Sequence, residues 1–207
     1  MQTRNVAVIA FLVLVVSACS GATGLPLRDD FSDPNSGWDR VNEVEGSTDY
    51  QDGGYRIFVD ETNYSIWANP NKGSYADVSI EVDVRKVAGP DDNEFGVICR
   101  HADPGSYYAA VISSDGFFGF WRRSDGNDLQ MIGYDQFQAS EAIHLGSESN
   151  HIRLDCVGST LTLYANGELL GEVSDSTIAS GDVGLYAGTF DLAGTDVLFD
   201  NFVASAP

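Results

Sequence analysis

Two acidic residues, Glu81 and Asp83, are separated by one apolar residue in a stretch where apolar and polar residues alternate. In a β-strand both carboxylates would project from the same face, about 7 Å apart. A pair of neighbouring carboxyl groups is the arrangement that glycosidases use to cleave a sugar linkage. Short matches of this kind occur more often on solvated strand faces than in active sites. We therefore interpret the pair as a solvated face and predict no catalysis from it.

The three histidines indicate no active site either. His101, His144 and His151 have neither the spacing of a metal site nor an obvious nucleophile as partner. The chain also lacks the Gly-x-Ser-x-Gly and His-Glu-x-x-His sequences that are typical of serine hydrolases and zinc proteases. Each histidine is therefore interpreted as a surface or strand-end residue, and no catalytic residue is predicted.

Aromatic side chains support a binding role instead. Several of them crowd one predicted hairpin, residues 107–121, where strand alternation sends them to both faces. The core needs at least half of these rings. Rings on the other face could line the concave side of the sandwich and stack on sugar C–H groups, while Arg122 or Arg123 donates to hydroxyls or a carboxylate. The predicted ligand-binding residues are Tyr107, Trp121, Arg122 and Trp67.

The elements that must position these rings are predicted to be strands. Residues 78–84 alternate valine or isoleucine with polar residues, which is the pattern of a strand with one buried face. Asn166-Gly167 lies between two further runs and predicts a type I′ hairpin, because both central residues must adopt positive φ. Chain reversals recur about every 8–12 residues without a convincing amphipathic helix. We predict an all-β fold in which two antiparallel sheets pack as a β-sandwich.

Two of the three cysteines, Cys99 and Cys156, lie in the middle of predicted strands on the faces that carry core residues. In an exported protein such a pair is more often oxidised than free. Opposed residues on adjacent antiparallel strands are close enough for a disulfide. We predict a structural disulfide between them. The alternative is two buried thiols on strands that are not neighbours.

The first eighteen residues have the pattern of a targeting segment. Arg4 precedes the apolar run 6–16, which is shorter than the roughly 20 residues of a membrane span. The next residues, Val16-Ser17-Ala18-Cys19, resemble a bacterial lipobox, in which the cysteine receives lipid and becomes the new N-terminus. An ordinary signal peptide with a chance cysteine is the alternative.

This pattern divides the chain into a lipoprotein signal peptide over residues 1–18, a lipidated tether over 19–26 and a single domain over 27–207. Several acyl chains on Cys19 would attach the protein stably to a membrane. We therefore expect an exported lipoprotein at the bacterial cell envelope, on the cell surface or at a periplasmic face.

The C-terminal motifs carry a family resemblance. Residues 163–170, residues 181–188 and the sequence Phe199-Asp200-Asn201-Phe202 resemble the end of a concanavalin A-like lectin/glucanase jelly roll. The sequence is closest to laminin-G-like modules and to bacterial 3-keto-disaccharide hydrolase-type domains. Residues 30–38 are similar to the start of many such exported domains. The resemblance implies a concanavalin A-like jelly roll and leaves the activity open, because these motifs specify strands and turns.

The resemblance also bears on two candidate sites. Laminarinase-type glucanases on this fold have a Glu-x-Asp-x-x-Glu strand, and here Lys86 takes the place of the last glutamate, which disfavours their mechanism. Related jelly rolls often hold a structural calcium ion between the first and last strands. That parallel makes Asp30 and Asp200 candidate ligands for Ca²⁺, which takes six to eight oxygens. The alternative is that Asp200 caps a local turn.

The charge balance excludes one class of partner. The chain has 31 acidic and 11 basic residues, a formal net charge of −20, so nucleic acid is not expected as a ligand. We predict a jelly-roll domain that binds carbohydrate or another envelope ligand without turnover. The alternatives are a glycosidase-type hydrolase acting on 3-keto-disaccharides and a protein-binding envelope scaffold.

Overall fold

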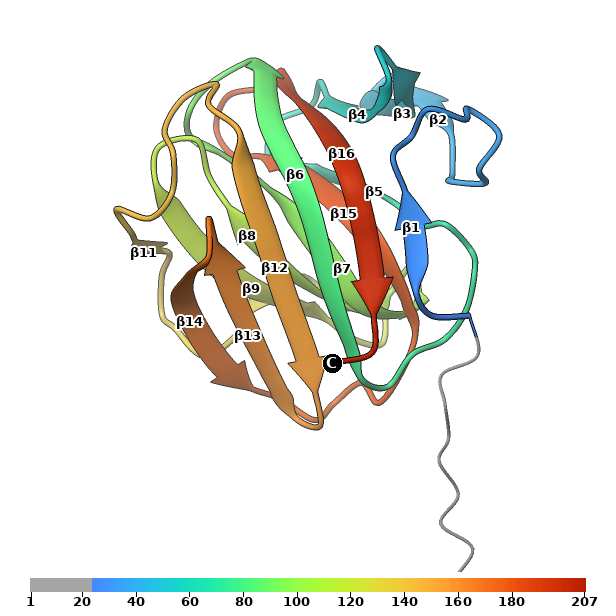
Figure 1. The fold of residues 1–207 in the computed structure, drawn as a ribbon. Helices are drawn as coiled ribbons and strands as arrows, with labels where there is room; N and C mark the ends of the chain where they lie inside the picture. The colour runs from blue at the N-terminus through green and yellow to red at the C-terminus, as the bar shows by residue number, and fades with distance from the viewer. Residues whose placement is uncertain (1–23) are drawn as a thin grey trace, which may run out of the picture.

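The computed structural model describes residues 24–207, and over this part the chain forms sixteen β-strands without a helix. The predicted signal peptide, residues 1–18, and the predicted lipidation site, Cys19, lie outside the described residues. Within residues 24–207, no helical segment has the length and apolar character to cross a membrane. The strands make two antiparallel sheets that pack face to face (Figure 1), which confirms the predicted all-β sandwich.

The larger sheet has nine strands, and its order brings together segments far apart in the sequence. The C-terminal strand β16 lies between β6 and β4, and the first strand, β1, pairs with its end. In order, the sheet contains β14 (Glu168–Ser174), β13 (Thr160–Ala165), β12 (Asn150–Val157), β6 (Val78–Ala88), β16 (Thr195–Ser205), β4 (Gly54–Val59), β3 (Gly46–Gln51) and β2 (Val41–Glu43), with β1 (Leu27–Asp29) beside β16.

The smaller sheet has seven strands and ends at the short edge strand β5. In order, it contains β10 (Gln130–Met131), β9 (Phe117–Arg123), β8 (Ser106–Ile112), β7 (Asn93–Asp103), β15 (Asp182–Thr189) and β5 (Ser65–Ala68), with β11 (Gln138–Ala139) also paired to β9. The strands β7, β8, β9 and β10 are consecutive both in sequence and in this sheet, whereas β15 and β5 join it through long connections.

The core between the sheets follows the predicted alternation. In β6, Val78, Ile80 and Val82 are completely buried, while Glu81 and Asp83 on the opposite face are half-buried. Burying each such apolar side chain stabilises the fold by roughly 1.5–3 kcal/mol. The hairpin between β13 and β14 turns at Asn166-Gly167, whose φ angles of 53° and 86° confirm the predicted type I′ geometry.

The disulfide between Cys99 and Cys156 is present, as predicted, but the predicted geometry was wrong. Cys99 lies in β7 of the seven-stranded sheet and Cys156 in β12 of the nine-stranded sheet. The two Cα atoms are 6.8 Å apart across the core, farther than opposed residues of adjacent strands. Both side chains point inward from facing sheets, so the bond joins the two layers of the sandwich.

The outer face of the seven-stranded sheet is also largely covered. Ile98, Tyr107, Ala109, Val111 and Tyr186 form a second buried cluster there. Half-buried aromatic and aliphatic side chains pack over this cluster, namely Trp67, Trp121, Leu129 and Phe137. This outer face carries three of the four residues that we predicted to bind a ligand.

Candidate functional site

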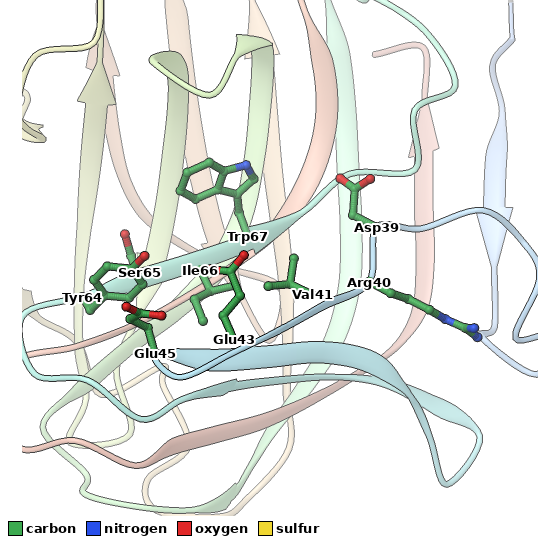
Figure 2. A pocket seen from close by; sticks show the side chains of 9 residues that line it. All are labelled: Asp39, Arg40, Val41, Glu43, Glu45, Tyr64, Ser65, Ile66 and Trp67. Carbon is green, nitrogen blue, oxygen red and sulfur yellow. The ribbon is translucent and has the colours of Figure 1, made fainter.

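The candidate site lies around Trp67, on edge strand β5 of the seven-stranded sheet. Two cavities, of about 400 and 560 Å³, share Asp39 and Trp67 and therefore adjoin. The smaller cavity is lined by Asp39, Arg40, Val41, Glu43, Glu45, Tyr64, Ser65, Ile66 and Trp67 (Figure 2). The larger cavity is lined by Asp39, Trp67, Asn69, Asn71, Gly73, His101, Ala102, Asp103, Pro104 and Asp182.

Trp67 is held in place by strand alternation and by two rings. Its neighbours Ile66 and Ala68 are buried in the core, so the indole projects from the outer face of the sheet. The indole packs against Tyr107, with ring centroids 5.4 Å apart, and against His101, at 6.2 Å. Trp67 is half-buried and lines both cavities, so part of its surface faces each of them.

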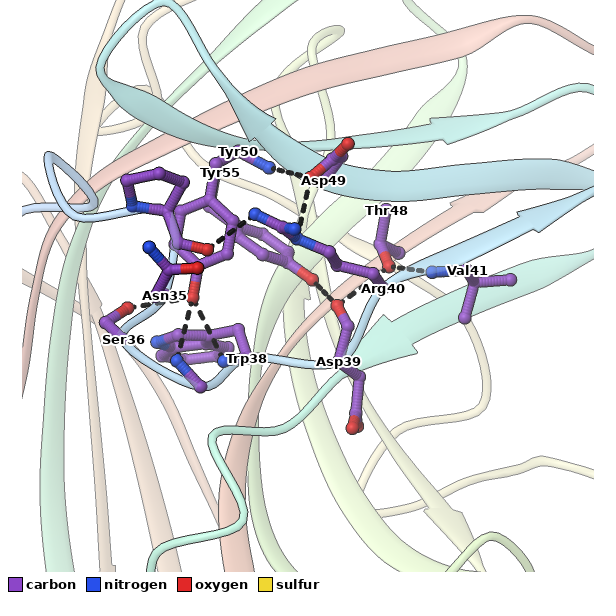
Figure 3. A network of polar contacts seen from close by, with 12 residues as sticks. Asn35, Ser36, Trp38, Asp39, Arg40, Val41, Thr48, Asp49, Tyr50 and Tyr55 are labelled. Carbon is purple, nitrogen blue, oxygen red and sulfur yellow. Dashed lines mark hydrogen bonds and ion pairs between the residues drawn. The ribbon is translucent and has the colours of Figure 1, made fainter.

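Asp39 belongs to the segment before β2, which a polar network anchors to β3 and β4 (Figure 3). The Tyr50 hydroxyl accepts hydrogen bonds from the backbone nitrogens of Gly37, at 3.1 Å, and Trp38, at 3.0 Å. The Asp39 carbonyl accepts hydrogen bonds from the hydroxyls of Tyr55 and Thr48. Burial raises the pKa of Tyr55, so its hydroxyl stays protonated and can donate. This network fixes the backbone that presents the Asp39 carboxylate to both cavities.

The larger cavity is acidic. Asp39, Asp103 and Asp182 line it, and none of its lining residues is a lysine or arginine. Burial lowers the pKa of His101, although the nearby Asp182 opposes this, so the imidazole is neutral at neutral pH. Burial raises the pKa of Asp182, and hydrogen bonds from the backbone nitrogens of Val183 and Lys72 act against that rise. The net field in this cavity is therefore negative.

Two polar atoms at the larger cavity have no hydrogen-bond partner. Asn69 is 2% exposed and donates from Nδ2 to the Val183 carbonyl at 2.6 Å, but its Oδ1 is unpaired. His101 Nε2 is likewise buried without a partner. Buried polar atoms are normally hydrogen-bonded, and exceptions often mark functional sites. Here both exceptions line the same cavity.

A buried carboxyl group, Glu94, lies beneath the outer face of the same sheet. The Trp121 indole nitrogen donates to Glu94 Oε2 at 2.6 Å, and the Tyr186 hydroxyl donates to Oε1 at 2.8 Å. Burial raises the pKa of Glu94 to about 7, although these hydrogen bonds act in the other direction. Glu94 contacts indole and phenol groups rather than a second carboxyl group, so it lacks the partner that glycosidase chemistry requires.

Three of the predicted ligand-binding residues share one face, and the fourth does not. Trp67, Tyr107 and Trp121 lie on the outer face of the seven-stranded sheet, with Tyr107 completely buried. Arg122 points to the opposite side of β9, where its guanidinium pairs with Asp175. The structure thus brings Trp67 to the two cavities and leaves Arg122 outside them.

The predicted calcium ligands show no shared coordination. Asp30 Oδ1 accepts hydrogen bonds from the backbone and side chain of Ser32, and Asp200 Oδ1 accepts one from the Asn201 nitrogen. Among residues 24–207 no group of three or more histidine, cysteine or acidic side chains could hold a metal ion. Two carboxylates would need backbone carbonyls and water to complete the six to eight oxygens around Ca²⁺. Calcium therefore stays a prediction.

The carboxylate pair of β6 has a partner that the sequence did not suggest. His151 Nδ1 lies 2.7 Å from Asp83 Oδ1, and His151 Nε2 lies 3.2 Å from Glu81 Oε2. The imidazole bridges the two acids from β12, on the outer face of the nine-stranded sheet. Both imidazole nitrogens are occupied, so this trio is a surface hydrogen-bond network.

Sequence reasoning missed most of the polar residues around Trp67. Asp39, Asn69 and Asp182 come from three separate segments, and no local pattern marks them. Glu94 did leave a signal, because it is the one charged residue in a strand segment, 94–99, that is otherwise apolar. A lone acid on a strand buried on both faces indicates a paired or protonated carboxyl group.

No protein-family model and no curated protein sequence matches this chain. Solved structures do match it. The carbohydrate-binding module CBM66 from Bacillus subtilis superposes with a TM-score of 0.56 at 19% identity, covering 82% of this chain and 96% of that one. The fold is a jelly-roll β-sandwich.

Two further structures support the same fold. A protein of unknown function with a galectin-like fold from Bacillus subtilis has a TM-score of 0.59 at 12% identity, covering 87% of this chain and 94% of that one. An endo-β-galactosidase from Clostridium perfringens that releases GlcNAcα1-4Gal also reaches 0.59, at 8% identity, with 86% of this chain and 61% of that chain covered. At these identities the jelly roll shares a fold with these proteins, and its ligand must be argued from its own residues.

Proposed function

We propose that this jelly roll binds carbohydrate at the two adjoining cavities around Trp67. The observation that supports the proposal most directly is a half-buried indole, Trp67, that lines both cavities together with Asp39. Aromatic rings stack on the C–H faces of sugars, and surrounding carboxylates and amides accept hydrogen bonds from hydroxyls. The fold relatives include a carbohydrate-binding module and a glycosidase, which agrees with this proposal.

Binding without turnover is the form of the proposal that the geometry favours. Each carboxylate of the larger cavity already accepts a hydrogen bond from a backbone nitrogen: Asp39 from Asn69, Asp103 from Gly105 and Asp182 from Val183. The backbone therefore holds these carboxylates in fixed orientations, which suits recognition of a ligand. The alternative is a hydrolase that acts on 3-keto-disaccharides. Detection of sugars released from oxidised disaccharides would support it.

A glycan array probed with the exported, detergent-solubilised protein tests the proposal. We expect binding to a restricted class of glycans and a loss of at least about tenfold in affinity in Trp67→Ala, the equivalent of about 1.4 kcal/mol. Phe117→Ala is the matched control, because Phe117 is a partly exposed aromatic residue of the same sheet outside both cavities. An array without binding, or equal losses in both variants, would exclude a sugar site at Trp67.

We also propose that lipid on Cys19 anchors the domain at the bacterial cell envelope. The basis is the lipobox-like sequence Val16-Ser17-Ala18-Cys19, and β1 begins only eight residues later, at Leu27. A tether this short would keep the sugar site near the membrane surface. Mass spectrometry of the N-terminal peptide should detect a diacylglyceryl cysteine, and Cys19→Ala should release the protein from the membrane fraction.

A further inference from the structure

We propose that the sugar bound at Trp67 carries a positively charged amino group. This inference rests on the proposed carbohydrate site and narrows its ligand to amino sugars with a free amine, as against neutral or acidic sugars. Three independent features of the two cavities point to an ammonium group: carboxylates without an ion-pair partner, a buried oxygen without a donor, and a half-buried indole that lines both cavities.

The first feature is the charge of the lining. Asp39, Asp103 and Asp182 line the larger cavity, and Glu43 and Glu45 line the smaller one. Within residues 24–207 none of these five carboxylates forms an ion pair with a lysine, arginine or histidine. Several like charges in one hollow raise the local concentration of a cationic ligand and repel an anionic one.

The nearest basic side chains, Arg40 and Lys72, contact other parts of the protein. Arg40 lines the smaller cavity, but its Nε lies 2.9 Å from Asp49 and its guanidinium stacks over Tyr50. Figure 2 shows the Arg40 side chain directed away from Trp67 and the two glutamates. Lys72 donates to Asp182 through its backbone nitrogen, while its ammonium group lies beside Gly37. The larger cavity therefore has no cation in its lining, and the guanidinium of Arg40 in the smaller one is paired with Asp49.

The second feature is the unpaired acceptor Asn69 Oδ1. The Asn69 amide nitrogen donates to the Val183 carbonyl, which fixes the orientation of the side chain and leaves its buried oxygen without a donor. Asn69 is 2% exposed and forms part of the wall of the larger cavity beside Asp39 and Asp182. The Asn71 amide nitrogen in the same wall already donates to Asp39 at 2.7 Å, and an ammonium group, with three donors and no acceptor, matches the acceptors that remain.

The third feature is Trp67 itself. Tryptophan has the best ring face for attracting an ammonium group, and the attraction grows when water is excluded. The indole adjoins Asp39 in both cavities, so one bound amine could contact the ring and a carboxylate together. A neutral sugar would stack on the same ring but would leave the carboxylates without a counter-charge.

Isothermal titration calorimetry of the exported, detergent-solubilised protein in EDTA tests the inference with three matched hexasaccharides. The β-1,4-linked hexamers of glucosamine, N-acetylglucosamine and glucose differ only in an ammonium, acetamido or hydroxyl group at C2. We expect the glucosamine hexamer to bind at least about tenfold more tightly than the other two, with the preference shrinking as salt screens the charges. EDTA removes metal-mediated binding, so a preference that appears only with added calcium would overturn the inference.

Variants of the acidic residues that line the cavities test whether their charge, rather than the fold, causes the preference for the glucosamine hexamer. Asp182→Asn should reduce the preference for the glucosamine hexamer by about fivefold, measured as the ratio of its affinity to the affinities of the two neutral hexamers. The double variant Glu43→Gln/Glu45→Gln alters one exposed and one half-buried residue of the smaller cavity and provides the same readout if Asp182→Asn is unstable. Glu148→Gln, an exposed acid outside both cavities, is the control and should change nothing.

The outcomes distinguish the two proposals. Tighter binding of a neutral hexamer, or equal binding of all three, would overturn the ammonium inference and leave the carbohydrate site standing. If the array showed an anionic glycan whose binding is lost in Trp67→Ala, the ammonium inference would likewise be overturned and the carbohydrate site would stand. A failure of every glycan to bind would overturn both.

Discussion

The indole nitrogen of Trp121 donates a hydrogen bond of 2.6 Å to the buried carboxyl group of Glu94. Glu94 is 4% exposed, and its other oxygen accepts from Tyr186, which is completely buried. The contact ties β7 to β9 and β15 beneath the outer face of the seven-stranded sheet. It places an acid with a pKa of about 7 inside the layer that supports Trp67.

Glu94 should make stability depend on pH between about 4.5 and 7. Its pKa is raised from an ordinary 4.5 to about 7 by burial, so over this range the folded protein retains a proton that the unfolded chain has released. Stability therefore falls as pH rises, by about 3 kcal/mol in total from this group. Glu94→Gln has no charge to desolvate; its amide oxygen can accept from the Trp121 indole, and its amide nitrogen can donate to the Tyr186 hydroxyl, which then acts as the acceptor.

Urea unfolding of the wild type and Glu94→Gln at pH 5 and pH 8 measures this effect. The variant should gain about 3 kcal/mol relative to the wild type on going from pH 5 to pH 8. A constant difference between the two proteins at both pH values would mean that Glu94 does not titrate in this range.

Gly188→Ala should destabilise the fold through Glu94. A Cβ on Gly188 would lie 2.6 Å from Glu94 Oε1, and the carboxyl group is held by two hydrogen bonds, so it has little room to move. Overpacking of this kind costs about 1–3 kcal/mol. In a Glu94→Ala background the same substitution should cost less, because the clashing oxygen is gone. Additive effects in the double-mutant cycle of unfolding free energies would contradict a direct contact.

Loss of the bond between Cys99 and Cys156 should destabilise the sandwich by about 4 kcal/mol, as the chain-entropy relation predicts for a loop of this length. The two residues are 57 positions apart and join opposite sheets. Denaturant unfolding of the wild type with and without reductant, compared with Cys99→Ala/Cys156→Ala, measures the loss. If the reductant also lowered the unfolding free energy of the double variant, its effect would be unrelated to this disulfide.

Arg56 and Asp196 should show strong energetic coupling. Arg56 Nε and Nη2 donate to the two Asp196 oxygens at 2.7 Å each, linking β4 to β16, and these hydrogen bonds raise the pKa of Arg56. The Asp196 side chain is 10% exposed, so solvent screens the pair only in part. A double-mutant cycle with Arg56→Met and Asp196→Asn should give a coupling of about 1–3 kcal/mol. The exposed pair Arg40–Asp49 is the comparison, with a coupling expected below about 1 kcal/mol.

Local patterns in the sequence determined the strands and several turns. The alternation at residues 78–84 predicted β6, and Asn166-Gly167 predicted the β13–β14 hairpin, because burial period and positive φ depend on neighbouring residues. The short edge strand β5 went unpredicted, since Ser65–Ala68 offers only one large aliphatic side chain on its inner face. The sequence also sufficed to select Trp67 as a candidate, because the chain has only three tryptophans.

Only the tertiary structure decided which strands are neighbours, and with that the identity of the site. It put Cys99 and Cys156 in facing sheets and turned Arg122 away from the aromatic face. It also gathered Asp39, Asn69 and Asp182 around Trp67 from three separate segments, with Asp182 more than a hundred residues from the other two. Pairing between distant strands is set by the packing of the whole core, so no local pattern carries it.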